Sequence, residues 1–190
     1  MSTAEKRFIS PQEYLTIERA SEIRHEYYNG EMFAMSGATR AHNLIASNIS
    51  ASFREQFADR ECEVYQSDMR VKVDRKGLYT YPDVVTAYDP KFEDEVFDTL
   101  INPRVIVEVL SKSTEGYDRG TRFEMYRRLP SLQDYVLVSQ DKMYVEHFQR
   151  QPDGRWILEE FDSPERTLAF ETSNCVLTVA DIYTKVSFET

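Results

Sequence analysis

The chain has 190 residues, of which 41% are hydrophobic and 29% charged, a balance typical of a globular protein with one sizeable core. The longest apolar runs fall well short of the ~18 to 20 residues of a transmembrane helix, and the polar start, Met1 to Ser10, lacks the apolar region of a signal peptide. The net charge of -10 argues against a general nucleic-acid coat protein, because such proteins rely on Lys and Arg to neutralise phosphates. We therefore predict a cytoplasmic protein without membrane contact.

The first third of the chain is predicted to contain a helix, a hairpin and a second helix. Ser10-Pro11-Gln12-Glu13 is a capping box with proline at the first helical position, which predicts a short helix to about Arg19. Asn29-Gly30, between two apolar segments, suits the two-residue turn of an antiparallel hairpin. From Thr39 to Phe57, apolar residues recur at helical spacing and predict one buried stripe, formed by Leu44, Ile45, Ile49, Phe53 and Phe57.

The middle of the chain is predicted to form a series of strands with one helix between the last two. A turn at Asp74 to Gly77 divides the early strands, and Pro130 ends the helix. The strand-helix-strand order is a crossover unit, which should make the two strands that flank the helix parallel. The predicted strands are Glu63 to Gln66, Met69 to Val73, Tyr81 to Tyr88, Arg104 to Leu110 and Tyr135 to Ser139, and the helix is Tyr117 to Arg128.

The last part of the chain is predicted to be an antiparallel meander. Strands at Met143 to Gln149 and Trp156 to Phe161 flank a turn at Pro152-Asp153-Gly154, and a short helix covers Val179 to Tyr183. No internal repeat or linker separates these elements, so we predict an α+β chain.

Two carboxylates beside or within apolar strands need an explanation. Asp83 precedes the apolar run Val84 to Ala87, and Glu108 interrupts the strand Arg104 to Leu110. A charged side chain is rarely buried unless it is paired or binds a metal. If the two strands are neighbours, Asp83 and Glu108 converge, and with a backbone carbonyl and waters they suit Mg²⁺ or Mn²⁺. Alternatively, Asp83 caps a turn and Glu108 pairs with Arg104 or Arg122.

Short motifs surround the two carboxylates: Asn29-Gly30-Glu31, Met35-Ser36-Gly37-Ala38 with His42, Tyr81-Pro82-Asp83-Val84-Val85, Val107-Glu108-Val109-Leu110-Ser111 with Ser113-Thr114, Tyr117-Asp118-Arg119-Gly120, and Tyr126-Arg127-Arg128 with Pro130-Ser131-Leu132 and Tyr135-Val136-Leu137-Val138. Over roughly Ser10 to Trp156 the set resembles the Uma-two family of proposed endonucleases, a branch of the PD-(D/E)XK superfamily. The resemblance implies one restriction-endonuclease-like α+β domain over residues 1–190. In such a domain, helices flank a mixed central sheet, with an extra N-terminal hairpin and C-terminal antiparallel strands. It also implies a divalent metal held by Asp83 and Glu108, and DNA cleavage.

The third catalytic position departs from the nuclease pattern, because the lysine expected two residues after the glutamate is Leu110 here. By the resemblance, a lysine on the following helix takes its place, and the matching position is Arg122. Arginine stays protonated and can stabilise charge on a phosphate, but it is a poor general base. Lys112, of the same strand parity as Glu108, is a second candidate. His42 is either a further site residue or a structural histidine at the start of its helix.

Three functions from different classes fit these residues. The first is a Mg²⁺-dependent DNA endonuclease, and the second is a degenerate nuclease fold that binds nucleic acid or protein without cutting, which Leu110 and the net charge favour. A glycosidase with paired carboxylates is disfavoured because the sequence shows no aromatic-lined sugar cleft. Between Arg104 and Arg128, six bases exceed four acids, so positive charge gathers around Glu108. Enzymes that cut both DNA strands are usually symmetric dimers, so we also predict a homodimer.

Overall fold

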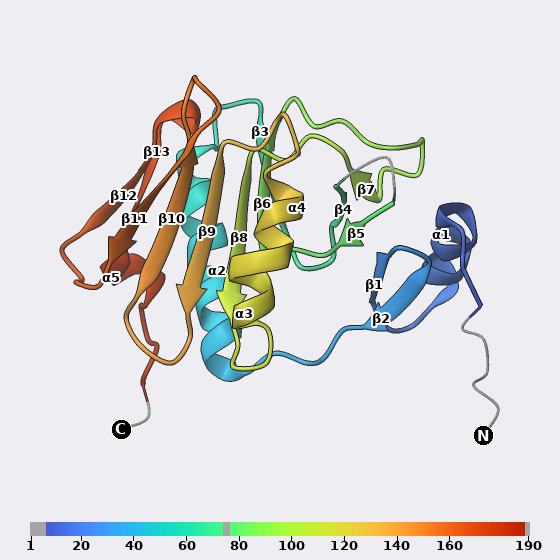
Figure 1. Cartoon of the computed structure of the whole chain (residues 1–190). Coiled ribbons are helices and arrows are strands. Elements are labelled where there is room, and N and C mark those ends of the chain that lie inside the picture. The colour runs from blue at the N-terminus through green and yellow to red at the C-terminus, as the bar shows by residue number, and fades with distance from the viewer. Residues whose placement is uncertain (1–6, 74–76, 189–190) are drawn as a thin grey trace.

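The structure is a computed structural model that describes residues 7–73 and 77–188 (Figure 1). Within these residues the largest sheet has six strands, in the spatial order β11 (Trp156–Phe161), β10 (Val145–Arg150), β9 (Asp134–Ser139), β8 (Val105–Leu110), β6 (Val84–Tyr88) and β3 (Cys62–Gln66). Strands β8 and β9 are parallel, whereas the other neighbouring pairs are antiparallel. The predicted crossover and the mixed central sheet are therefore confirmed.

One face of this sheet is covered by helix α2 (Arg40–Gln56), which Thr39 caps by accepting a hydrogen bond from the His42 amide. Helix α5 (Val179–Ile182) and the hairpin of β12 (Thr167–Phe170) and β13 (Cys175–Thr178) pack on the same face, with the short 3-10 helix Glu171–Ser173 in the hairpin connection. The predicted apolar stripe of α2 is buried there except for Leu44, which is half-buried and lines a pocket.

The opposite face is covered by three consecutive helical segments, α3 (Glu115–Tyr117), a π-helical stretch (Asp118–Arg122) and α4 (Phe123–Tyr126), as Figure 1 shows in yellow. Met125 and Tyr126 are buried here against Ile106, Leu110 and Tyr135. The helix predicted from Tyr117 to Arg128 thus begins and ends two residues earlier. Its π-helical stretch, a rare conformation that often occurs at functional sites, was not predicted.

A second, smaller sheet contains the N-terminal hairpin and has the order β2 (Glu31–Ala34), β1 (His25–Tyr28), β5 (Tyr79–Thr80), β4 (Arg70–Lys72) and β7 (Thr99–Leu100). The predicted capping box begins α1 (Pro11–Ala20), and Asn29 and Gly30 have the positive φ values that the predicted turn requires. Tyr14 of α1 packs against Tyr27 and Tyr79, so this sheet has its own apolar cluster.

Some strands differ from the sequence predictions in where they begin or in being present at all. The strand predicted from Tyr81 to Tyr88 begins at Val84, because the chain passes from one sheet to the other at residues 81–83 and Pro82 has no N–H to donate to a ladder. Strands β5, β7, β12 and β13 were not predicted. The turn at Asp74 to Gly77 lies outside the described residues except for Gly77.

Among the described residues, no helix has the length and apolar composition to cross a membrane.

Candidate active site

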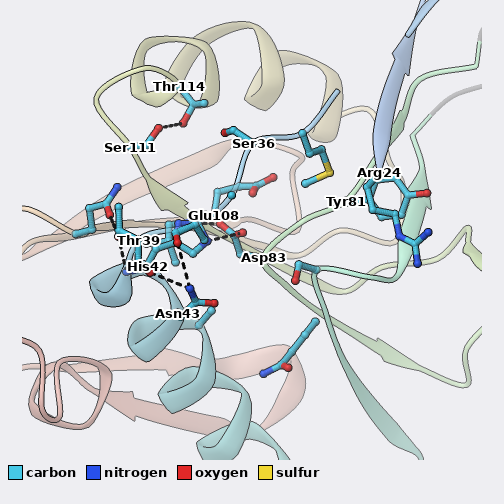
Figure 2. Close-up of a pocket in the computed structure, with 18 of the residues that line it drawn as sticks. Arg24, Ser36, Thr39, His42, Asn43, Tyr81, Asp83, Glu108, Ser111 and Thr114 are labelled. Atoms are coloured by element: carbon cyan, nitrogen blue, oxygen red, sulfur yellow. Dashed lines mark hydrogen bonds and ion pairs between the residues drawn. The ribbon is translucent and has the colours of Figure 1, made fainter. Parts of the chain in front are cut away.

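Asp83, directly before β6, lies beside Glu108 of the neighbouring antiparallel strand β8. Val84 of β6 pairs with Val107 of β8, so the next positions along the two strands are Asp83 and Glu108. Both residues line one pocket of about 990 Å³ (Figure 2). The side chains of residues 106, 108 and 110 point to the face covered by the π-helical segment, whereas those of 105, 107 and 109 point toward α2. The predicted adjacency of the two strands is therefore confirmed, and Asp83 and Glu108 line the same pocket.

Asp83 is held by contacts from two elements. Its Oδ2 accepts a hydrogen bond of 2.7 Å from the backbone N–H of Val109, and its Oδ1 lies 2.8 Å from Nε2 of His42. Figure 2 shows His42 reaching from the start of α2 toward Asp83. These contacts fix the position of the Asp83 carboxylate, and each oxygen keeps capacity for a further ligand, because a carboxylate can accept about four interactions. His42 therefore belongs to the site as a neighbour of Asp83.

Glu108 is buried and bonded to the helical segment above it. Its Oε1 accepts hydrogen bonds from Nη1 of Arg122 at 3.0 Å and from the hydroxyl of Tyr126 at 2.9 Å. The alternative in which Glu108 pairs with Arg122 is thus a real contact, whereas Arg104 bonds to the carbonyl of Thr172. Both partners of Glu108 point at one oxygen. This arrangement orients the carboxylate toward the pocket that it lines.

Arg122 is enclosed by three carboxylates from three parts of the chain. Besides Glu108, its Nη2 donates to both carboxylate oxygens of Glu26 on β1, at 2.9 and 2.8 Å. Its Nε lies 3.1 Å from Oδ1 of Asp118, but the N–H direction is wrong for a hydrogen bond, so both atoms lack a hydrogen-bond partner. The contact between Arg122 and Asp118 is therefore an ion pair without a hydrogen bond. Arg122 is 8% exposed, and its guanidinium joins the N-terminal sheet to the main one.

The site carries more negative than positive charge in a desolvated place. Burial raises the pKa of Glu108; Arg122 opposes this rise, while Asp83, Asp118 and Glu26 add to it. Burial likewise raises the pKa of Glu26 and of Asp118, with Arg122 again as the main opposing group. Burial alone would lower the pKa of Arg122, but the surrounding carboxylates hold it well above its usual value. Four acidic groups thus share one fixed cation, an arrangement that favours binding of a further cation.

The remaining predicted residues are placed as follows. Lys112 is exposed and lies outside the pocket lining, whereas Leu110, at the position of the missing lysine, is buried in the core. Two further polar residues, Gln66 at the end of β3 and Asp68 in the turn after it, also line the pocket and are exposed. Sequence reasoning missed Glu26 and the inward position of Asp118. The spacing of four residues between Asp118 and Arg122, which puts both on one helix face, was the available signal for Asp118.

The donor set fits a hard divalent cation. Asp83 and Glu108 bring two carboxylates to the lining of one pocket, and Mg²⁺ commonly takes only one or two protein carboxylates and keeps several waters. Within residues 7–73 and 77–188, no group of three or more His, Cys, Asp or Glu side chains is close enough to form a preformed metal cage. The identity of the metal and the roles of Asp83, Glu108, Arg122, Lys112 and His42 stay predictions.

The fold is nuclease-like. A crystal structure described as "a putative nuclease belonging to DUF820", from Anabaena variabilis ATCC 29413, superposes with a TM-score of 0.74 at 18% sequence identity, over 94% of this chain and 99% of that one. This likeness confirms the predicted restriction-endonuclease-like fold.

Sequence comparison gives the family. The Uma2 family, described as "Putative restriction endonuclease", matches residues 11–180, so the chain belongs to the Uma2 family, as its motifs indicated. Two proteins of Synechocystis sp. (strain ATCC 27184 / PCC 6803 / Kazusa), both named as uncharacterized, are also similar. The protein slr1290 is 33% identical over 95% of this chain and 94% of its own length, and sll1609 is 36% identical over 90% and 97%.

Proposed function

We propose that this protein is a divalent-metal-dependent endonuclease that hydrolyses phosphodiester bonds in DNA. The observation that carries the proposal is the side-by-side placement of Asp83, directly before β6, and Glu108 of β8 in a pocket of about 990 Å³. Membership of the Uma2 family supports nuclease chemistry. The site would hold Mg²⁺ or Mn²⁺ on these two carboxylates, and the cation would supply Lewis-acid stabilisation of phosphate charge and a more acidic water.

The protein side chains have separate tasks in this proposal. Asp83 is oriented by the Val109 amide and by His42, which makes His42 a positioning residue. Glu108 is oriented by Tyr126 and Arg122. Arg122 stays our predicted group for stabilising the scissile phosphate, and to do so it must exchange part of its contact with Glu26 for the substrate. Lys112 stays the second candidate, since its exposed side chain starts next to the pocket residue Ser111.

A protein that binds nucleic acid without cutting it is the second candidate. Two observations favour it: Leu110 is buried where the nuclease pattern has lysine, and the present contacts of Arg122 all go to carboxylates of the chain. If Arg122 keeps these contacts when substrate is bound, no cation of the protein reaches the phosphate from this position. The two candidates share the fold and differ in whether bonds are broken.

Incubation with defined nucleic acids separates these candidates. Purified wild-type protein should cleave single-stranded, duplex or supercoiled DNA in the presence of Mg²⁺ or Mn²⁺, and EDTA should stop the reaction. An equal panel of RNA substrates tests the preference for DNA. If the protein binds nucleic acid but cleaves none of these substrates, the endonuclease proposal is wrong, and the protein that binds without cutting takes its place. Light scattering on the same preparation tests the predicted homodimer.

A further inference from the structure

One wall of the pocket that contains Asp83 and Glu108 carries exposed apolar side chains. Three of them come from the N-terminal hairpin and the residues that flank it: Ile23 is 57% exposed, Phe33 49% and Met35 36%. Exposed apolar side chains that gather inside a pocket commonly mark a binding site for a ligand with an apolar surface. A hydrated metal ion and a phosphate have no such surface, so the proposed metal site does not account for this wall.

The strand pairing of the hairpin explains why its apolar side chains face the pocket. Side chains alternate across a strand, and Tyr27 of β1 and Met32 of β2 pack into the apolar cluster around Tyr14. Their neighbours Glu26 and Phe33, which pair with each other across the hairpin, face the other way and line the pocket. The hairpin thus holds the Phe33 ring at the pocket without burying it.

Arg24 adds a positive charge to the same wall. The backbone N–H of Met35 donates to the carbonyl of Arg24 at 2.9 Å, so these two residues lie side by side beyond the last ladder pair. The guanidinium of Arg24 lies 5.9 Å from the ring centroid of Tyr81, and Figure 2 shows both residues on one side of Asp83. Its Nε lies 3.5 Å from Oδ1 of Asp68, and both side chains of this ion pair are exposed. Such a pair contributes little, so Arg24 can exchange Asp68 for a phosphate.

We infer that Ile23, Arg24, Phe33 and Met35, here called the hairpin wall, bind an unpaired nucleobase and its phosphate beside the scissile bond. The inference rests on the proposed function, because it uses the same pocket, and it narrows the substrate to nucleic acid with unpaired bases. Aromatic side chains beside cations hold single-stranded nucleic acid without reading its sequence. The bases of a duplex expose only their edges in the grooves, so they cannot lie against Phe33.

Binding of a fluorescent single-stranded DNA oligonucleotide and of its blunt duplex tests the inference. Anisotropy is measured in Ca²⁺, and a gel shows that the probe stays intact. The wild type should bind the single strand more tightly than the duplex. Phe33→Ala should weaken single-strand binding ~5- to 150-fold, the loss expected for one stacked base, whereas Phe33→Trp keeps an aromatic face and should bind like the wild type. Arg24→Gln should lower the slope of log affinity against log salt by ~0.7, as expected for one lost phosphate contact on a single strand.

Phe97→Ala is the matched control, because Phe97 is an exposed phenylalanine outside the pocket lining. It should bind both probes like the wild type, and the variants should melt close to the wild-type temperature, since the substituted side chains are exposed. Equal binding by Phe33→Ala and Phe97→Ala would overturn the inference, as would a wild type that prefers the duplex or binds neither probe. A smaller particle for Phe33→Ala in light scattering would also overturn it, because the hairpin wall would then be a contact between copies of the chain.

The same experiment separates the hairpin wall from the proposed function. Single-strand binding that depends on Phe33, in a protein that cuts no nucleic acid, would uphold the hairpin wall and refute the endonuclease. Equal binding and equal cleavage of single-stranded DNA by the wild type and Phe33→Ala would uphold the endonuclease and refute the hairpin wall.

Discussion

Asp83→Asn and Glu108→Gln should each abolish metal-dependent cleavage. The expected loss in cleavage rate is larger than the ~10²- to 10³-fold loss that follows removal of one preorganised hydrogen-bond donor. The reason is that each substitution removes one of the two carboxylates that would hold the cation, while its amide oxygen can still accept the existing hydrogen bonds. Both variants should also raise the melting temperature of the metal-free protein, because carboxylates in this desolvated pocket repel one another. The stabilisation that Mg²⁺ gives to the wild type should disappear.

Asp68→Asn is the matched control for these two variants. Asp68 lines the same pocket, but its side chain is exposed, and its Oδ1 lies 3.5 Å from Nε of Arg24. The same change of charge at this position should leave cleavage and the Mg²⁺-dependent melting shift close to wild type. If Asp83→Asn and Glu108→Gln keep a normal melting response to Mg²⁺, the ion binds elsewhere, and the acidic loop from Asp89 to Asp98 is then the first place to look.

Arg122→Ala should lower the free energy of unfolding by ~3 to 5 kcal/mol, the usual cost of removing one partner from a buried charged group. Arg122 is 8% exposed and contacts Glu26, Glu108 and Asp118, so its removal leaves two buried carboxylates and one half-buried carboxylate without their cation. Urea unfolding in the absence of metal measures the effect. Arg122→Lys should recover only part of the loss, because one ammonium cannot reproduce the geometry of the guanidinium.

Arg128→Ala provides the comparison for this measurement. Arg128 lies six residues further along the chain and pairs with Glu124 in an exposed i,i+4 contact, which contributes ~0.3 to 0.5 kcal/mol. A loss of stability for Arg122→Ala no greater than that for Arg128→Ala would contradict the description of Arg122 as the cation that joins the two sheets. Any comparison of cleavage by Arg122→Ala and Lys112→Ala must be made where both variants are folded, and there we expect the larger loss at Arg122.

The part of the site that depends on local periodicity could be predicted from the sequence. Glu108 is the one charged residue in an otherwise apolar strand, and alternation along that strand separates it from Val107 and Val109. The crossover from β8 to β9 follows from the strand-helix-strand order, because such connections join parallel neighbours. Antiparallel pairing of β6 with β8 then brings Asp83 beside Glu108.

The contacts that cross between the two sheets could not be predicted in this way. Glu26 and Arg122 are 96 residues apart, and nothing in the spacing of either residue indicates a partner on the other sheet. The short strands β5 and β7 have two residues each, too few to show a period, so only the hairpin and β4 of the second sheet were predicted. The π-helical stretch has no sequence signature that periodicity can detect, although it decides which way Asp118 and Arg122 point.

A crystal soaked in Mn²⁺ tests the central claim most directly, because the anomalous signal of manganese locates the ion without reference to activity. The proposed site predicts one strong peak between the carboxylates of Asp83 and Glu108, with the Val109 amide still donating to Asp83. A peak elsewhere in the molecule, or none at these carboxylates at Mn²⁺ concentrations that support cleavage, would contradict the metal site and the endonuclease proposal that depends on it.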